Sequence, residues 1–133
     1  MVITREIDYA VRIIRDLSRG GRKKIDEICR NELIPRQFSY KILKKLEKSG
    51  LVKIFRGADG GYALTADYRN LSLFDIIVSI NKELVFSECL GHGYNCPLNI
   101  GGKAPCGVHA ELERIQAITF AHLKEKKLPE IFK

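Results

Sequence analysis

The apolar positions in the first half of the chain recur every three to four residues, which is the period of amphipathic helices. Residues 2–18 carry one such stripe, residues 25–31 carry a shorter one, and a third runs from Pro35 to Gly50. Proline suits the first turn of a helix, and glycine commonly follows the last turn. The pattern therefore predicts three helices that share a core. The core positions expected from the first and third helices are Ile3, Ile7, Ala10, Val11, Ile14, Leu17, Phe38, Ile42, Leu43 and Leu46.

After the third helix the pattern changes to the alternation typical of strands. Residues 51–55 and 62–65 read as two strands around the turn 56–61, and residues 59–61 (Asp-Gly-Gly) are expected to supply the positive backbone dihedrals of a tight hairpin. The second and third helices, joined by residues 31–34, have the proportions of a helix-turn-helix. A basic helix followed by a hairpin is the layout of a winged helix.

Two more helices are predicted in the second half of the chain. Residues 72–80 form a short one, which Ser72 can cap with Asp75 as its capping-box partner. Residues 107–126 form the longest one, whose apolar stripe resembles a coiled-coil seam of under three heptads. The stripe consists of Val108, Leu112, Ile115, Thr119 and His122 or Leu123. It can pack on the first helix or on its own copy, and we expect the copy, in a homodimer.

Between these helices lies an irregular stretch, residues 87–109, that is rich in glycine and in metal-ligating side chains. Long irregular segments inside small domains are usually functional or disordered. The candidate ligands are Cys89, His92, Cys96, Cys106 and His109. Soft thiolates together with imidazole suit zinc or an iron–sulfur cluster. The fourth cysteine, Cys29, falls among apolar helix positions and is expected to be a small buried hydrophobe.

The excess of positive over negative charge lies entirely in the first half of the chain. Residues 1–70 hold 16 Lys and Arg against nine Asp and Glu, a net charge of +7, whereas residues 71–133 hold seven of each sign. Between Pro35 and Gly57 there are seven basic residues and one acidic residue, Glu47. Such a local excess is the electrostatic footprint of a protein that binds the phosphate backbone of nucleic acid.

Composition and motifs exclude several other classes. No apolar run approaches the 18 residues that a membrane helix needs, and the charged N-terminal sequence is not a signal peptide, so we expect a cytoplasmic protein without a membrane partner. In that reducing compartment four cysteines indicate metal or redox chemistry rather than disulfides. No Cys-x-x-Cys, phosphate-binding glycine loop or Ser–His–Asp order is visible, so we do not expect an enzyme.

Three sequence patterns together resemble the iron–sulfur transcription regulators of the IscR and NsrR type. They are Tyr9-Ala-Val, the stretch from Gln37 to Val52, and the wing sequence Arg56-Gly-Ala-Asp-Gly-Gly-Tyr-Ala-Leu. The three-cysteine segment and the long helix after it also match. The resemblance covers essentially the whole chain and implies a winged-helix, DNA-binding homodimer whose cysteines hold a cluster. It implies a sensor of iron or cluster supply, redox state or nitric oxide.

The resemblance further implies that Cys89, Cys96 and Cys106 are the cluster-binding thiolates. His109, three residues after Cys106, matches the fourth ligand of IscR-like members and slightly favours a [2Fe–2S] over a [4Fe–4S] cluster. Asp8 matches the acidic residue that the partner subunit donates in NsrR-like members. The spacing Cys-x6-Cys-x9-Cys has a longer second gap than the better-known members. The fourth ligand therefore stays open, with His92 as a third candidate.

Two alternatives to the cluster remain. Three thiolates and a histidine also form a common structural zinc site, although such sites usually pair their cysteines at shorter gaps. The cysteines can also act as bare thiol sensors in a winged-helix regulator without metal.

The residues expected to contact DNA lie on the third helix and the wing. Arg36, Gln37, Tyr40 and Lys41 are the expected base-reading positions, because Gln pairs with adenine and Arg with guanine in the major groove. Ser39, Lys44 and Lys45 are expected to contact phosphates. Arg56 is placed to enter a narrow minor groove, as the matching arginine of the family does.

The sequence predicts a mainly α fold with a small β-hairpin: a winged helix-turn-helix plus a long C-terminal dimerisation helix. Residues 1–70 form the DNA-binding region, 71–86 a connecting helix, 87–106 the cluster-binding loop and 107–133 the dimerisation helix and tail. We expect the dimer to read an inverted-repeat operator in double-stranded DNA, with its two basic helices in major grooves roughly one helical turn apart.

Overall fold

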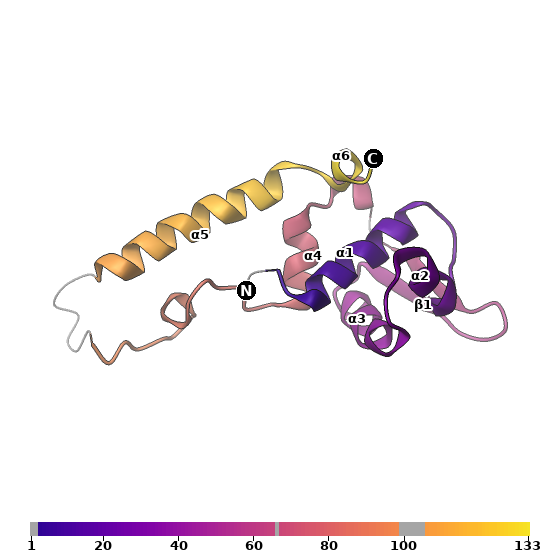
Figure 1. Ribbon diagram of the computed structural model, residues 1–133, viewed down its shortest axis with the longest axis horizontal. Helices are drawn as coiled ribbons and strands as arrows, with labels where there is room; N and C mark the ends of the chain where they lie inside the picture. The colour runs from indigo at the N-terminus through magenta and orange to yellow at the C-terminus, as the bar shows by residue number, and fades with distance from the viewer. Residues whose placement is uncertain (1–2, 66, 99–105) are drawn as a thin grey trace.

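The computed structural model describes residues 3–65, 67–98 and 106–133. Its helices and strands follow one another along the chain as in Figure 1. They are α1 (Arg5–Ser18), α2 (Ile25–Glu32), α3 (Arg36–Lys48), β1 (Val52–Phe55), β2 (Gly61–Leu64), the 3-10 helix η1 (Tyr68–Asn70), α4 (Leu73–Ile80), the 3-10 helix η2 (Glu88–Leu90), α5 (Gly107–Glu125) and α6 (Leu128–Ile131). The predicted fold class is confirmed, and the ends of the predicted elements differ from these by three residues or fewer.

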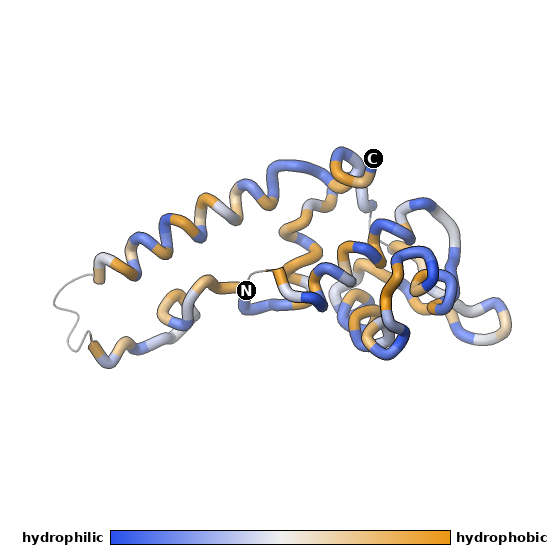
Figure 2. Tube along the Cα trace, in the orientation of Figure 1, coloured by the Kyte–Doolittle hydropathy of each residue, from blue (hydrophilic) through white to orange (hydrophobic). Residues whose placement is uncertain are grey.

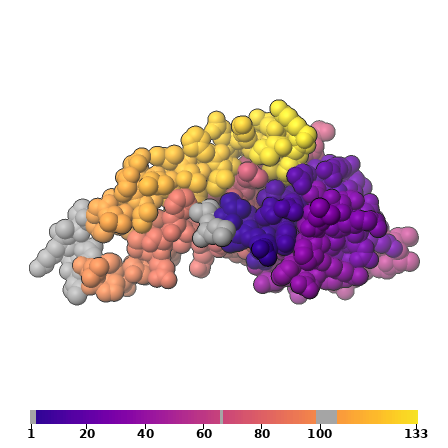
Figure 3. Space-filling model, in the orientation of Figure 1, coloured from indigo at the N-terminus to yellow at the C-terminus, as the bar shows by residue number. Residues whose placement is uncertain are grey.

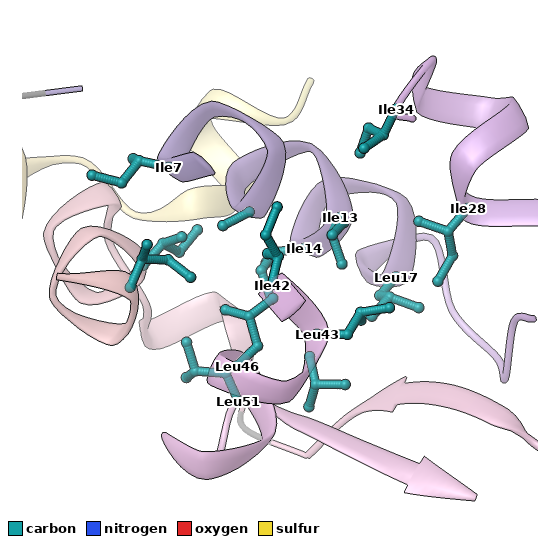
Figure 4. Packing of buried hydrophobic residues seen from close by; sticks show 14 of the residues in the cluster. Ile7, Ile13, Ile14, Leu17, Ile28, Ile34, Ile42, Leu43, Leu46 and Leu51 are labelled. Atoms are coloured by element: carbon teal, nitrogen blue, oxygen red, sulfur yellow. The ribbon is translucent and has the colours of Figure 1, made fainter. Parts of the chain in front are cut away.

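The core lies where α1 packs against α2, α3 and α4. Thr4 caps α1 by accepting a hydrogen bond from the backbone N–H of Ile7, and the apolar stripe that follows is buried. Figure 4 shows side chains from α1, α2 and α3 meeting in this core. Ile3 is an exception to the prediction, because it precedes α1 and is 45% exposed.

Charged groups also join the first helices. The Asp16 carboxylate on α1 is fully buried and accepts hydrogen bonds from Lys23 at 3.0 Å and from Asn31 of α2 at 3.2 Å. Glu32 at the end of α2 is buried as well and is held by Arg15, whose Nε donates at 3.0 Å. This hydrogen bond raises the pKa of Arg15 above its ordinary value. Burying either carboxylate without these partners would cost free energy of folding. The contacts therefore fix α2 against α1.

The turn between α2 and α3 contains an unusual backbone conformation. Leu33, which caps the end of α2, has φ 55° and ψ 49°, in the left-handed region, and its N–H bonds to the carbonyl of Cys29. Its side chain is 82% exposed, whereas the next residue, Ile34, is buried. The left-handed residue therefore turns the chain so that Ile34 enters the core and α3 can begin.

The wing is a two-stranded antiparallel hairpin in which Val52 pairs with Leu64 and Phe55 with Gly61. The segment between α1 and α2 adds a short third edge, because Lys23 and Tyr62 exchange two backbone hydrogen bonds, of 2.9 and 2.7 Å. Burial raises the pKa of Tyr62 above its ordinary value. The Lys23–Tyr62 pairing thus attaches the wing to the body at the start of β2.

The second half of the chain adds an arm, which consists of α5 and the chain that carries η2. The arm extends from the body, which consists of α1–α4 and carries the wing. α4 begins at the predicted capping box, with the N–H of Ser72 donating to Asp75 at 2.7 Å. α6 returns to this point, where Leu128 is fully buried and its N–H bonds to the carbonyl of Leu71 at 2.9 Å. From there α5 extends, beside the chain that carries η2, to the end of the molecule opposite the wing (Figure 1).

α5 packs on α4 and beside η2, and it has no fully buried residue. Orange apolar positions recur along its whole length in Figure 2, and the helix forms one long edge of the molecule in Figure 3. Its outward apolar side chains include Val108, Ile115 and Ile118, which are 69%, 37% and 46% exposed. Within the described residues, no helix is long and apolar enough to cross a membrane.

Candidate nucleic-acid interface and metal centre

The outer face of α3 is polar and basic, while its inner face belongs to the core. Ile42, Leu43 and Leu46 are at most 1% exposed and fix the rotation of the helix. That rotation leaves Arg36, Gln37, Tyr40, Lys41 and Lys44 exposed. Four of these five are the positions expected to read bases, and Lys44 is one of those expected to contact phosphate.

Arg36 at the start of α3 already has two partners. Its guanidinium donates to the Tyr40 hydroxyl at 2.9 Å and pairs with Asp26 of α2 at 3.0 Å. The hydrogen bond to Tyr40, and then the charge of Asp26, raise the pKa of Arg36. All three side chains are exposed, so Arg36 can exchange Asp26 for a base edge or phosphate at small cost.

Ser39 and Lys45, which the sequence predicts to contact phosphate, are each engaged with other groups of the protein. Ser39 is fully buried, donates to the carbonyl of Pro35 at 3.3 Å and lies 3.1 Å from the Cys29 sulfur, so the expectation that its side chain faces phosphate is wrong. Cys29, which the sequence predicts to be a small buried hydrophobe, is half-buried. Lys45 is half-exposed and forms an ion pair of 2.7 Å with Glu6 of α1.

Phe38 is the reverse case of Ser39. The sequence places it in the core, but it is 44% exposed and lies against Tyr9, with ring centroids 6.0 Å apart. It borders the polar face of α3 and is therefore a further surface residue near the candidate interface.

Arg56 begins the turn of the wing. It is exposed and forms no ion pair within the described parts of the chain. The left-handed residues of the turn are Gly57 and Gly61, with φ of 94° and 143°, and not the whole stretch 59–61 as the sequence suggested. Gly60 is needed for space instead, because a Cβ there would lie 2.8 Å from the Gly57 carbonyl oxygen.

The three cysteines of the irregular stretch lie near the far end of the arm. Cys89 is in η2 and contacts the Ser87 hydroxyl at 3.2 Å, Cys96 follows in irregular chain, and Cys106 precedes the first turn of α5. The start of the segment is tied to α5, because the N–H of Phe86 donates to the Gln116 side chain at 2.8 Å.

The described residues do not bring the predicted ligands together. Among residues 3–65, 67–98 and 106–133, no group of three or more Cys, His, Asp or Glu side chains is placed to hold a metal ion. His109 is half-buried in the first turn of α5, His92 is exposed, and Asp8 pairs with Arg12 at 2.9 Å. Residues 99–105, between Cys96 and Cys106, lie outside the described parts. The donor set of three free thiols and an imidazole nevertheless fits an iron–sulfur cluster chemically.

Comparison with known families decides the class of the protein. A family model described as "Rrf2: Iron-dependent Transcriptional regulator" matches residues 3–133. The chain belongs to the Rrf2 family. Rrf2 proteins and the relatives of this chain are transcriptional regulators and not enzymes, which confirms both the predicted DNA-binding class and the absence of an enzymatic role.

Individual relatives agree with membership of the Rrf2 family. Protein aau3 of Rhizobium meliloti is 30% identical over all of this chain and 86% of its own length. The HTH-type transcriptional regulator IscR of Vibrio vulnificus is 29% identical over 70% of this chain and 57% of its own length.

Solved structures confirm the Rrf2 winged-helix fold. T. potens IscR aligns with a TM-score of 0.74 at 21% identity, covering 96% of this chain and 83% of that one. The oxidized form of Staphylococcus aureus CymR aligns with a TM-score of 0.72 at 18% identity, covering 100% and 97%.

Three residues that contact parts of the two candidate sites were not predicted from this Rrf2 sequence. Asp26 and Glu6, which pair with Arg36 and Lys45, read in the sequence as ordinary acidic positions of helices. Gln116 shows no signal beyond its place on α5. Glu6 and Asp26 lie in the first turns of their helices, where acidic residues are common, and this hides any second role.

Proposed function

We propose that this Rrf2 regulator is a homodimer that binds an operator through α3 and the wing, and that an iron–sulfur cluster on Cys89, Cys96 and Cys106 controls the binding. The main support for the proposal is that the basic face and the cysteines lie in different parts of the molecule. A basic reading face lies on the body and three free cysteines lie on the arm, with α4 and α5 between them.

In the proposed complex, α3 lies in the major groove of the operator. Gln37 and Lys41 meet base edges, Arg36 joins them after leaving Asp26, and Tyr40 is held in place by its hydrogen bond from Arg36. Lys44 contacts phosphate without breaking an ion pair of the described residues. Lys45 does so only if it leaves Glu6. Arg56 enters the neighbouring minor groove.

The cysteine segment, which is the part of the chain that carries Cys89, Cys96 and Cys106, would hold the cluster beside α5. A bound cluster supplies a group whose loss, oxidation or attack by nitric oxide reports iron supply or redox state. The chain contributes the Cys106 thiol, next to the first turn of α5, and a tether at Phe86. Of the candidate fourth ligands, His109 is one turn from Cys106, whereas Asp8 would have to exchange its ion pair with Arg12.

The dimer is proposed to form through α5. Val108, Ile115 and Ile118 form an exposed apolar face, and exposed apolar patches on helices commonly mark interfaces. Two copies joined there would present two basic helices to an inverted repeat. The cluster state that favours the DNA-competent spacing then tightens binding through linkage.

Iron and sulfide content after anaerobic isolation tests the cluster. The parent chain is expected to be coloured, with thiolate-to-iron absorption, while Cys96→Ala loses most of its iron. Cys29→Ala is the matched control and keeps its iron, because Cys29 lies in the body beside α3. A colourless parent with bound zinc, or equal iron in all three chains, contradicts the proposal.

A regulator with bare thiols is the second candidate. It is favoured by the exposure of Cys106, which makes that thiol accessible to an oxidant in solution. It predicts that iron-free protein releases the operator after mild thiol oxidation and rebinds it after reduction. The cluster proposal predicts instead that reduction without iron and sulfide does not restore the regulated state.

A further inference from the structure

The wing carries Arg56 on a hairpin of only two short strands. Such a hairpin is marginally stable by itself in water. The direction in which Arg56 points is therefore set by whatever holds the wing against the body.

The connection between α1 and α2 provides part of that hold where β2 begins, close to the turn. Lys23 and Tyr62 pair through two backbone hydrogen bonds. The backbones approach so closely that a Cβ at Gly61 would lie 2.7 Å from the Lys23 carbonyl oxygen and 3.1 Å from the Arg22 side chain. These contacts fix the start of β2 but do not reach the tip of the turn.

Arg22 reaches the tip. Its guanidinium carbon lies 3.6 Å from the centre of the Phe55 ring, and its Nη1 donates to the carbonyl oxygen of Asp59 at 2.6 Å. Phe55 and Asp59 lie on the two sides of Arg56 in the sequence. One planar side chain from outside the wing thus joins the end of β1 to the far side of the turn. The planar guanidinium can stack and donate at once, which a lysine ammonium cannot do with the same geometry.

We propose that Arg22 is a positioning residue for operator recognition, which presets the wing turn so that Arg56 is aimed at the minor groove before DNA arrives. The inference rests on the proposed contact of Arg56 with DNA. A preset turn raises affinity because the ordering cost is already met in the free protein. Arg22 acts through Arg56 and does not itself need to touch DNA.

A double-mutant cycle tests this role. Affinities are measured for the parent, Arg22→Ala, Arg56→Ala and the double variant, on two versions of one selected operator duplex. The versions differ only in the flank where the wing lies, which is an A-tract in one and G·C-rich in the other. A-tracts narrow the minor groove and attract arginine, so the ratio of the two affinities reports the wing contact and not the overall stability of the fold.

We expect Arg22→Ala to weaken A-tract binding by about 5-fold, the order expected for one exposed cation–π contact and one hydrogen bond. The ratio between the duplexes should fall toward one, as in Arg56→Ala, and in the Arg56→Ala background the Arg22 change should have no further effect. Arg22→Lys should behave like Arg22→Ala, because it keeps the charge but loses the geometry. Arg30→Ala, which removes an exposed charge from α2, should leave the ratio unchanged.

The results that overturn the inference are distinct from those that overturn the Arg56 contact. Additive losses in the double variant, with a salt slope lowered by about one for Arg22→Ala alone, would mean that Arg22 binds phosphate directly. Full activity of Arg22→Lys would mean that charge alone suffices. If Arg56→Ala changes neither affinity nor ratio, the minor-groove contact itself is wrong, and the positioning role falls with it.

Discussion

At the scale of single residues, the backbone of Leu33 is held in a conformation that leucine disfavours. Its φ of 55° belongs to the left-handed region, where the Cβ of an L-residue lies too close to the following carbonyl oxygen. The side chain offers little in return, because it is 82% exposed. The strain is therefore supported by the packing of its neighbours, and above all by the buried Ile34.

Replacing Leu33 with glycine should stabilise the protein. We expect Leu33→Gly to raise the free energy of unfolding by about 0.5–1 kcal/mol, since glycine adopts this conformation without steric cost. Gly50→Ala is the matched control: Gly50 has φ 78° and open space around a Cβ, so only backbone strain is added and stability should fall by about 1 kcal/mol. Urea unfolding at one fixed protein concentration measures both. A loss of stability in Leu33→Gly would contradict the strain argument.

The contrast between Phe38 and Ser39 shows where sequence reasoning stops at this scale. Residue hydrophobicity assigned Phe38 to the core and Ser39 to the surface, and the structure reverses both. Ser39 stands three, four and seven residues before Ile42, Leu43 and Leu46, so the helical period alone places it on the buried stripe. Phe38, four residues before Ile42 and eight before Leu46, falls only at the edge of that stripe, and its apolar character decided its assignment to the core. The partners Glu6 and Asp26 depend on tertiary contacts and could not be read from spacing at all.

At the scale of secondary structure, the ends of the helices were predictable because local chemistry sets them. Ser72 with Asp75, and the glycine after α3, act through contacts within a few residues. The third edge of the wing, formed by Lys23, was not predictable. It depends on where the connection between α1 and α2 lies in space, and a single bridging residue leaves no periodic pattern.

The exposed face of α5 leads to a prediction about assembly. Ile115→Glu should convert a homodimer into a monomer at micromolar concentration, because it would bury a charge without a partner in the interface. Ala117→Glu introduces the same side chain at an exposed position on the other side of the helix and should leave the dimer intact. Sedimentation velocity distinguishes the two. Equal masses for both variants would show that α5 pairs through another face or not at all.

At the scale of the whole molecule, aromatic and polar contacts link the arm to the reading helix. Phe120 of α5 lies edge-on between Phe86, which precedes the cysteines, and Phe74 of α4, with ring centroids 6.1 and 5.2 Å away. At the other end of α4, the Ser79 carbonyl accepts a hydrogen bond at 3.3 Å from Ser49, the residue that ends α3. An unbroken series of contacts therefore joins the segment that carries the cysteines to α3 through two packed helices. The split of charge and cysteines was visible in the sequence, whereas this connection was not.

Whether the state of the cysteine segment governs DNA binding can be decided by one comparison. It is the dissociation constant for a selected operator duplex, measured at one salt concentration, for the iron-loaded and the iron-stripped protein. If the cysteine segment controls binding, the two dissociation constants should differ by about 5- to 150-fold, the range of ordinary allosteric coupling. Equal constants for the two forms, with iron verified in one and absent from the other, would contradict it.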